Sequence, residues 1–196
     1  MISASAFILI GGKSKRFGTT KWQAKINGKT VLDRLWGSCE KFKERYIVGK
    51  DQQHDQRKPF LKDKLDIEAP INGLYTALDH STTEWILLLS CDLPLIDQRT
   101  LDHLWSFVRT EKKAIIPEVN GRLQPTCGFY KKEIKDLIIE QIENNSLGLI
   151  ELIRKLDYHS IDLTERSNYF LNMNTKSDMR AAEKILSSKV LDKSLL

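Results

Sequence analysis

Residues 7–21 read Phe7-Ile-Leu-Ile-Gly-Gly-Lys-Ser-Lys-Arg-Phe-Gly-Thr-Thr-Lys21, an apolar run that ends on two glycines and leads into a basic loop. The apolar run predicts a buried strand, and Gly11 and Gly12 let the following backbone pass where a Cβ atom would clash. Backbone N–H groups beside Arg16 and Lys21 suit a polyphosphate. The alternative is a glycine-rich turn with a solvated basic rim, because short glycine motifs often occur by chance. The loop matches neither the P-loop nor the G-x-G-x-x-G pattern.

Length and composition predict one soluble α/β domain over residues 1–196. The net charge of +5 suits anionic ligands but does not require nucleic acid. Cys39, Cys91 and Cys127 stand far apart with no C-x-x-C pair, which argues against a structural zinc site or a disulfide framework and favours a reducing compartment. The first apolar run feeds directly into the glycines and indicates a strand rather than a signal peptide. No segment approaches the roughly 20 apolar residues that span a bilayer. From the cysteine usage we expect a cytoplasmic protein.

Strand and helix patterns alternate along the chain. Strands are expected at residues 3–10, 46–49, 85–89, 114–117, just before 130, and at 158–163. Helices are expected from Thr30, from Pro70, from Asp97, over 131–143, over 147–156, and from a Ser/Thr-x-x-acid box at 175–178. The polar residues 50–64 are interpreted as a loop. This alternation predicts a mainly parallel sheet, and ligands of such sheets bind at the carboxyl ends of the strands, so Gly11, Gly12 and Asp92 are expected at one edge.

Five further motifs follow the glycine loop in order: Ile26-Asn-Gly-Lys29, Pro70-Ile-Asn-Gly73, Cys91-Asp-Leu-Pro94, Gln124-Pro125 with Cys127 and Tyr130, and Asn172-Met-Asn-Thr175. Together with residues 9–21, they resemble the motifs of the molybdenum cofactor guanylyltransferases, a family within the nucleotidyltransferases that share a Rossmann-like sheet. Each motif alone is weak, but six in order at suitable spacing are specific. The resemblance implies a three-layer Rossmann-like fold of the nucleotide-diphospho-sugar-transferase type, with helices on both faces of a mainly parallel sheet.

The resemblance also implies an activity, namely transfer of GMP from GTP to the terminal phosphate of molybdopterin (the Mo-molybdopterin cofactor). The products are molybdopterin guanine dinucleotide and pyrophosphate, and the implied cofactor is Mg²⁺. GTP and molybdopterin are the implied ligands, other molybdenum-cofactor biosynthesis proteins are candidate partners, and neither nucleic acid nor membrane is expected.

Site residues follow from the motifs one by one, as the resemblance implies. The catalytic set is Arg16, Lys21 and Asp92. Arg16 would offer a planar fork to the β- and γ-phosphates, Lys21 a point charge near the α-phosphate, and Asp92 a carboxylate for Mg²⁺. Asn172 and Asn174 are assigned to the molybdopterin side. The nucleotide-binding set is Leu9, Ile10, Gly11, Gly12, Lys21, Asp66, Gly73 and Asp92.

The sequence departs from the family pattern at several positions. Ile10 stands where a small residue is usual, Phe17 replaces a methionine, and Ala69 replaces a glycine. Residues 49–50 are Gly-Lys where family members often carry an asparagine that touches the nucleotide, and Asp66 aligns loosely with an aspartate near the base. Base specificity is therefore the least determined part of the interpretation.

Other functions stay open at this point. A related enzyme could move CMP to molybdopterin or a nucleotide to a sugar phosphate. A non-catalytic nucleotide sensor would not need Arg16, Lys21 and Asp92 together. A nucleic-acid-binding domain would place its basic residues along an exposed helix interleaved with aromatic residues, which this chain does not do. In a purely structural interpretation, Asp92 is a turn residue after a strand, and Asn172 and Asn174 end a strand before a helix.

Overall fold

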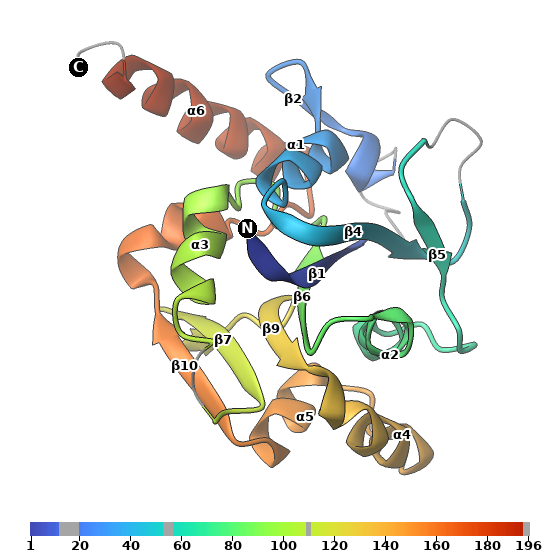
Figure 1. Cartoon of the computed structure of the whole chain (residues 1–196). Coiled ribbons are helices and arrows are strands. Elements are labelled where there is room, and N and C mark those ends of the chain that lie inside the picture. Colours follow the sequence, from blue (N-terminus) through green and yellow to red (C-terminus); the bar gives the residue numbers. More distant parts are fainter. Residues whose placement is uncertain (12–19, 53–56, 109–110, 194–196) are drawn as a thin grey trace.

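An eight-stranded sheet forms the middle of the molecule (Figure 1). The computed structural model describes residues 1–11, 20–52, 57–108 and 111–193. The strand order is β10-β7-β9-β6-β1-β4-β5, with β8 beside β7, and β2 and β3 form a separate hairpin. The strands are β1 (Ile2–Leu9), β2 (Lys25–Ile26), β3 (Lys29–Thr30), β4 (Phe42–Gly49), β5 (Phe60–Lys62), β6 (Trp85–Ser90), β7 (Ala114–Val119), β8 (Arg122–Leu123), β9 (Cys127–Lys131) and β10 (Tyr158–Asp162).

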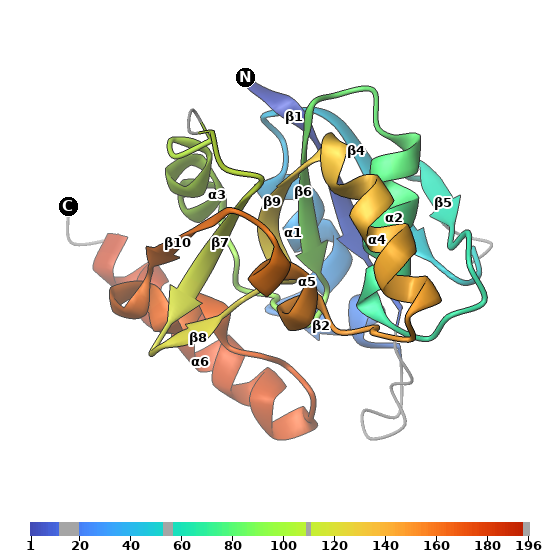
Figure 2. The same cartoon turned by 90° about the horizontal axis from the view of Figure 1, so that it is seen from below.

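Helices cover both faces of this sheet. The α-helices are α1 (Val31–Ser38), α2 (Pro70–His80), α3 (Gln98–Trp105), α4 (Lys135–Glu143), α5 (Leu149–Lys155) and α6 (Lys176–Lys193), and 3₁₀ turns span Lys21–Gln23, Lys132–Ile134 and Thr164–Phe170. Helices α1, α3 and α6 lie on one face, whereas α2, α4 and α5 lie on the other (Figures 1 and 2). The expected three-layer arrangement is therefore confirmed.

Most strand pairs in the sheet are parallel. Strand β1 runs parallel to β4 on one side and to β6 on the other, β4 runs parallel to β5, and β7 runs parallel to β10. Strand β9 is antiparallel to both β6 and β7. The prediction of a mainly parallel sheet is correct, and β9 is the strand that makes it mixed.

The two central strands are buried on both faces, as their continuous apolar sequences predict. Ala4, Ala6 and Ile8 of β1 pack in the core on the α1 side, whereas Phe7 packs in the core on the α2 side. The same alternation divides residues 86–89 of β6 between the two cores. Side chains of a strand point to opposite faces with a period of two, so each central strand contributes to both layers of helices.

Side-chain caps fix the helix starts that the sequence predicts. The Thr30 hydroxyl accepts a hydrogen bond from the Asp33 N–H at 3.0 Å and caps α1. The Asp97 carboxylate accepts one from the Thr100 N–H at 2.9 Å and caps α3. Each cap satisfies an N–H group that the first helical turn cannot pair. The predicted Asn-Gly turn joins β2 to β3, where Asn27 has a φ of 49° and Gly28 a φ of 78°.

One expectation and one alternative interpretation from the sequence are wrong in detail. Residues 50–64 were expected to form a loop, but β5 lies within them and pairs with the end of β4. A three-residue edge strand with one neighbour is too short to show a periodic pattern. No strand includes residues 171–174, so Asn172 and Asn174 do not end one. Backbone pairing of Met173 with Asp92 holds this segment instead.

Candidate functional site

The ends of β1 and β6 meet at one edge of the sheet. Leu9 pairs with Ser90 in the parallel register, and the Cys91 N–H donates to the Leu9 carbonyl at 3.0 Å. Gly11 and Asp92 therefore leave neighbouring strands at the same carboxyl edge, as predicted, while Gly12 lies outside the described residues. The order of the strands reverses at β1, because β4 and β5 lie on one side of β1 and the next strand of the sheet, β6, lies on its other side. Such a switch point is where open α/β sheets bind their ligands.

The backbone around Asp92 is fixed by hydrogen bonds on both sides. Its N–H donates to the Ser90 hydroxyl at 3.1 Å, and its carbonyl accepts from the Met173 N–H at 2.8 Å. The Asp92 side chain keeps 32% of its surface exposed. A rigid main chain thus presents a carboxylate to solvent at the edge of the sheet.

Lys21 connects Asp92 to the asparagine segment. Its ammonium donates to Asp92 Oδ1 at 2.8 Å and to Asn174 Oδ1 at 2.6 Å. The Asn174 amide in turn donates to Asn172 Oδ1 at 2.9 Å. Only 16% of the Lys21 side chain is exposed. Three stretches that are distant in sequence, represented by Lys21, Asp92 and Asn172–Asn174, therefore form one polar cluster.

The start of α6 positions Asn174. The Asp178 carboxylate accepts from the N–H of Asn174 at 2.9 Å and from the N–H of Thr175 at 2.7 Å. The Asp178 N–H donates back to the Thr175 hydroxyl at 3.2 Å, which completes the predicted capping box. The backbone hydrogen bond from Asn174, followed by the one from the Thr175 side chain, lowers the pKa of the Asp178 carboxyl. This carboxylate therefore stays ionised and holds Asn174 toward Lys21.

Gly11 and Gly73 are glycines for different reasons. A Cβ atom at Gly11 would have no heavy atom within 4 Å, so packing of the described residues does not require a glycine there. A Cβ atom at Gly73 would lie 2.5 Å from the Leu9 Cδ2 atom, so the first turn of α2 sits directly against the end of β1. Leu9 and Gly73, both predicted to bind nucleotide, are thus neighbours. Ile10 continues the edge, with its N–H bonded to the Val48 carbonyl at 3.0 Å.

Asp66 lies on the β4 side of the edge, in the loop of residues 63–69 between β5 and α2. It is exposed and is separate from the Lys21–Asp92 pair, which lies on the β6 side. Lys50, at the end of β4, reaches across to Glu68 of this loop at 2.6 Å. The hydrogen bond to Glu68 raises the pKa of the Lys50 ammonium, and the charges of Glu68 and Asp66 add to the effect.

Sequence reasoning missed two contacts that hold this edge together. The capping box of Thr175 and Asp178 was recognised as a helix start, but its contact with Asn174 was not. Asn72 was quoted only as part of a motif, although its buried amide bonds to the loop that carries Asp66. Arg16, predicted to be catalytic, lies outside the described residues.

The described residues hold no group of three or more His, Cys, Asp or Glu side chains that could bind a metal by themselves. Asp92 alone still fits Mg²⁺, which is bound in many nucleotide sites through one or two carboxylates, waters and substrate phosphates. The Cys91 thiol beside it is buried, which raises its pKa to about 12 and makes it a poor metal ligand or nucleophile.

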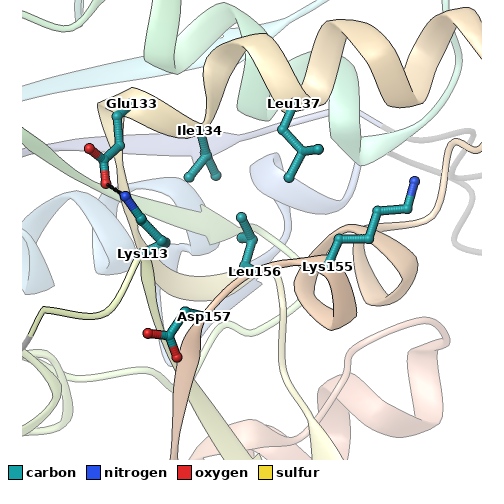
Figure 3. A pocket seen from close by; sticks show the side chains of 7 residues that line it. All are labelled: Lys113, Glu133, Ile134, Leu137, Lys155, Leu156 and Asp157. Atoms are coloured by element: carbon teal, nitrogen blue, oxygen red, sulfur yellow. Dashed lines mark hydrogen bonds and ion pairs between the residues drawn. The ribbon is translucent and has the colours of Figure 1, made fainter.

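A cavity of about 270 Å³ lies elsewhere in the molecule (Figure 3). Its lining includes Lys113, which precedes β7, and Asp157, which precedes β10. Glu133 and Leu137, after β9, complete another side of it. These residues place the cavity at the amino ends of the parallel strands, so it lies at the edge opposite Gly11 and Asp92.

Solved structures of nucleotidyltransferases have the same fold. Molybdopterin-guanine dinucleotide biosynthesis protein A from Archaeoglobus fulgidus superposes with a TM-score of 0.80 at 21% identity, covering 94% of this chain and 99% of that chain. A 2-C-methyl-D-erythritol 4-phosphate cytidylyltransferase from Thermus thermophilus gives a TM-score of 0.69 at 10% identity, covering 92% and 98%. The fold is therefore the Rossmann-like fold of the nucleotidyltransferases.

Sequence comparison identifies the family within this class. The MobA-like NTP transferase domain matches residues 6–159, and the chain belongs to this family. A relative from Aquifex aeolicus is 34% identical over 180 residues, which cover 90% of this chain and 88% of the relative. One from Flavobacterium johnsoniae is 30% identical over 183 residues, covering 91% and 96%. Each is named "Probable molybdenum cofactor guanylyltransferase".

Family membership makes the chain an enzyme that transfers nucleotides. Among the helices of the described part of the chain, none has both the length and the apolar character needed to cross a bilayer.

Proposed function

We propose that the protein transfers GMP from GTP to the terminal phosphate of molybdopterin, forming molybdopterin guanine dinucleotide and releasing pyrophosphate. The names of its relatives support this assignment. The observation that carries it is the Lys21–Asp92 pair, 2.8 Å apart at the switch point of the sheet and beside Gly11. A cation, a carboxylate and an open glycine backbone are the groups that a transfer between two polyanions needs.

In this reaction an oxygen of the molybdopterin phosphate attacks the α-phosphorus of GTP. The bond between that phosphorus and the oxygen bridging to the β-phosphate breaks, and pyrophosphate leaves. A phosphate monoester has its second pKa near 6, so at neutral pH the attacking oxygen is already largely ionised. No strong general base is therefore required, and the enzyme has to position two anions and offset their charge.

Asp92 is the residue that we assign to Mg²⁺. When bound, the ion would supply positive charge that offsets the negative charge of the phosphates and of the departing pyrophosphate. Asp92 suits this role because its backbone is fixed at two points while its carboxylate stays one-third exposed.

Lys21 is assigned to the charge that develops on the α-phosphate. Its ammonium is held by Asp92 and Asn174, which places a point charge at the reacting edge. Arg16 is assigned from the sequence to the β- and γ-phosphates, where its planar fork suits two oxygens.

Asn172 and Asn174 are assigned to the molybdopterin side. The contacts of Asn174 support this assignment, since it bonds to Lys21 through its oxygen and to Asn172 through its nitrogen. Leu9, Ile10, Gly11, Gly12 and Gly73 are assigned to the nucleotide, with Asp66 near the base. The three cysteines are buried free thiols, which supports a reducing location such as the cytoplasm.

The test is to incubate the purified protein with GTP, Mg²⁺ and molybdopterin and to identify the product by mass spectrometry. The proposal predicts molybdopterin guanine dinucleotide and one pyrophosphate per dinucleotide. Formation of the cytosine dinucleotide instead, when CTP and GTP compete at equal concentration, would assign the chain to CMP transfer.

A further inference from the structure

One face of α2 is bonded along its length to the loop of residues 63–69. Asn72, Thr76 and Asp79 follow at helical spacing and lie on this face. Thr76 accepts from the Lys64 N–H at 3.0 Å, and Asp79 pairs with the Lys64 ammonium. The loop therefore cannot move independently of the helix without breaking these contacts.

Asn72 makes the closest connection to the middle of the loop. Its Oδ1 accepts from the Leu65 N–H at 3.1 Å, while its Nδ2 donates to the carbonyls of Leu65 at 2.6 Å and Ile67 at 3.0 Å. Only 1% of the Asn72 surface is exposed. These bonds are partly buried, so each contributes more than a fully exposed bond would.

Asp66 is the residue between these two anchored positions. The peptide groups of Leu65 and Ile67 are both fixed by the same buried amide, whereas the Asp66 side chain itself is exposed at the rim. On the other side of the loop, Lys50 pairs with Glu68 at 2.6 Å. The arrangement presents one carboxylate on an immobilised backbone, beside the end of β4.

We infer that Asn72 is a positioning residue for base selection, which acts by holding Asp66 where its carboxylate meets the base. The inference rests on the proposed use of GTP. Guanine presents its N1–H and 2-amino groups side by side, and one carboxylate accepts both in a paired contact. Cytosine offers an amino group next to acceptors, which a carboxylate repels. A carboxylate on a loose loop would lose this discrimination, because ordering the loop would oppose binding.

The experiment measures dissociation constants of GTP, ITP and CTP for the wild type, Asn72→Ala, Asp66→Ala and Thr76→Val. ITP lacks only the 2-amino group of GTP, so the ratio of its dissociation constant to that of GTP reports the paired contact. We expect Asn72→Ala to lower this ratio about fivefold or more, toward that of Asp66→Ala. Turnover at saturating GTP should stay within about twofold of the wild type, because Asn72 does not touch the reacting phosphates.

Thr76→Val is the matched control. It removes a partly buried hydrogen bond from the same helix face to the same loop, but at Lys64 rather than beside Asp66. Its ITP-to-GTP ratio should equal that of the wild type. If Asn72→Ala does not fold, Asn72→Ser replaces it, since a hydroxyl retains part of the bonding to the loop.

Two outcomes would count against the inference, and they are distinguishable. If the wild type prefers GTP and Asn72→Ala keeps the same ratio, the positioning role is wrong and the proposed function stands. If the wild type itself does not prefer GTP over CTP, the proposed function fails and the inference fails with it. If Thr76→Val lowers the ratio of the ITP to the GTP dissociation constant as much as Asn72→Ala does, the loop has loosened generally. That result would also overturn the specific role of Asn72.

Discussion

The ammonium of Lys21 donates a hydrogen bond to Asp92 Oδ1 at 2.8 Å, although the two residues are 71 positions apart in the chain. Two separate structural features produce this contact. Parallel pairing of β1 with β6 brings Gly11 and Asp92 to the same edge of the sheet, and pairing of Met173 with the Asp92 carbonyl brings Asn174 to the same place. The proposed reaction places both charges against the phosphates of the nucleotide.

Replacing Asp92 with asparagine should remove activity and preserve the fold. The side chains are nearly the same size, but the amide cannot supply the negative charge that we assign to Mg²⁺. Turnover at ordinary Mg²⁺ should fall by about 10²-fold or more, while the melting temperature stays close to that of the wild type. Single-turnover assays and thermal melts measure the two effects.

Asp102→Asn is the matched control for that variant. Asp102 also pairs with a lysine, since Lys41 lies 2.6 Å from its carboxylate, and the side chain is exposed to a similar degree at 36%. It lies on α3, away from the glycine edge, so its turnover should be unchanged. Normal turnover in Asp92→Asn would contradict the assignment of Asp92 to the metal.

Replacing Lys21 with alanine should separate turnover from binding. If Lys21 offsets charge that builds on the α-phosphate only during the reaction, then its removal lowers the rate more than the affinity. Loss of one such contact costs about 10²–10³ in rate, or roughly 3–4 kcal/mol. The GTP dissociation constant and the single-turnover rate should be measured on the same preparation. A variant that binds GTP weakly but turns over normally at saturation would show that Lys21 only helps to bind GTP.

Gly11→Leu should weaken nucleotide binding without destabilising the protein. A Cβ atom at this position meets no heavy atom of the described residues within 4 Å, so their packing leaves room for it. If the Gly11 N–H approaches a phosphate, the new side chain occupies the space of the ligand. We expect an unchanged melting temperature and a GTP dissociation constant raised about tenfold or more. An unchanged dissociation constant would indicate that the glycine serves only as a turn.

The ion pairs of Asp79 should make stability depend on pH. Hydrogen bonds from Lys135 and then from Lys64 lower the pKa of the Asp79 carboxyl to about 2. A carboxyl with a lowered folded pKa stabilises the protein above its unfolded pKa, near 4, and this contribution is lost as pH falls toward 2. Asp79→Asn should therefore melt about 2 °C below the wild type at pH 7. The difference in melting temperature between the two proteins should disappear between pH 4 and pH 2. A difference that persists at pH 2 would mean that the ion pairs do not cause it.

The sequence predicts well those features that depend on local patterns. The apolar run 85–89, the caps at Thr30 and Asp97 and the box at 175–178 each act through neighbours in the chain, so their residue types identify them. Strand β5 was missed because three residues at the edge of a sheet are too few to show the alternation of apolar and polar side chains that identifies a strand.

Contacts between distant segments are harder to predict. Nothing local to Asn174 indicates that it meets Lys21, and nothing local to Asn72 indicates that its amide anchors the loop around Asp66. Both contacts arise only when the sheet and α2 are assembled. The motif resemblance pointed to several of these positions, whereas the partner of each side chain became visible only in three dimensions.

The most direct test of the proposed function is the rate of pyrophosphate release with GTP, CTP, ATP or UTP, each with and without molybdopterin. GMP transfer predicts fast release only when GTP, molybdopterin and Mg²⁺ are present together, and loss of that release in Asp92→Asn. Faster release with CTP than with GTP, or release from GTP at the same rate without molybdopterin, would contradict it.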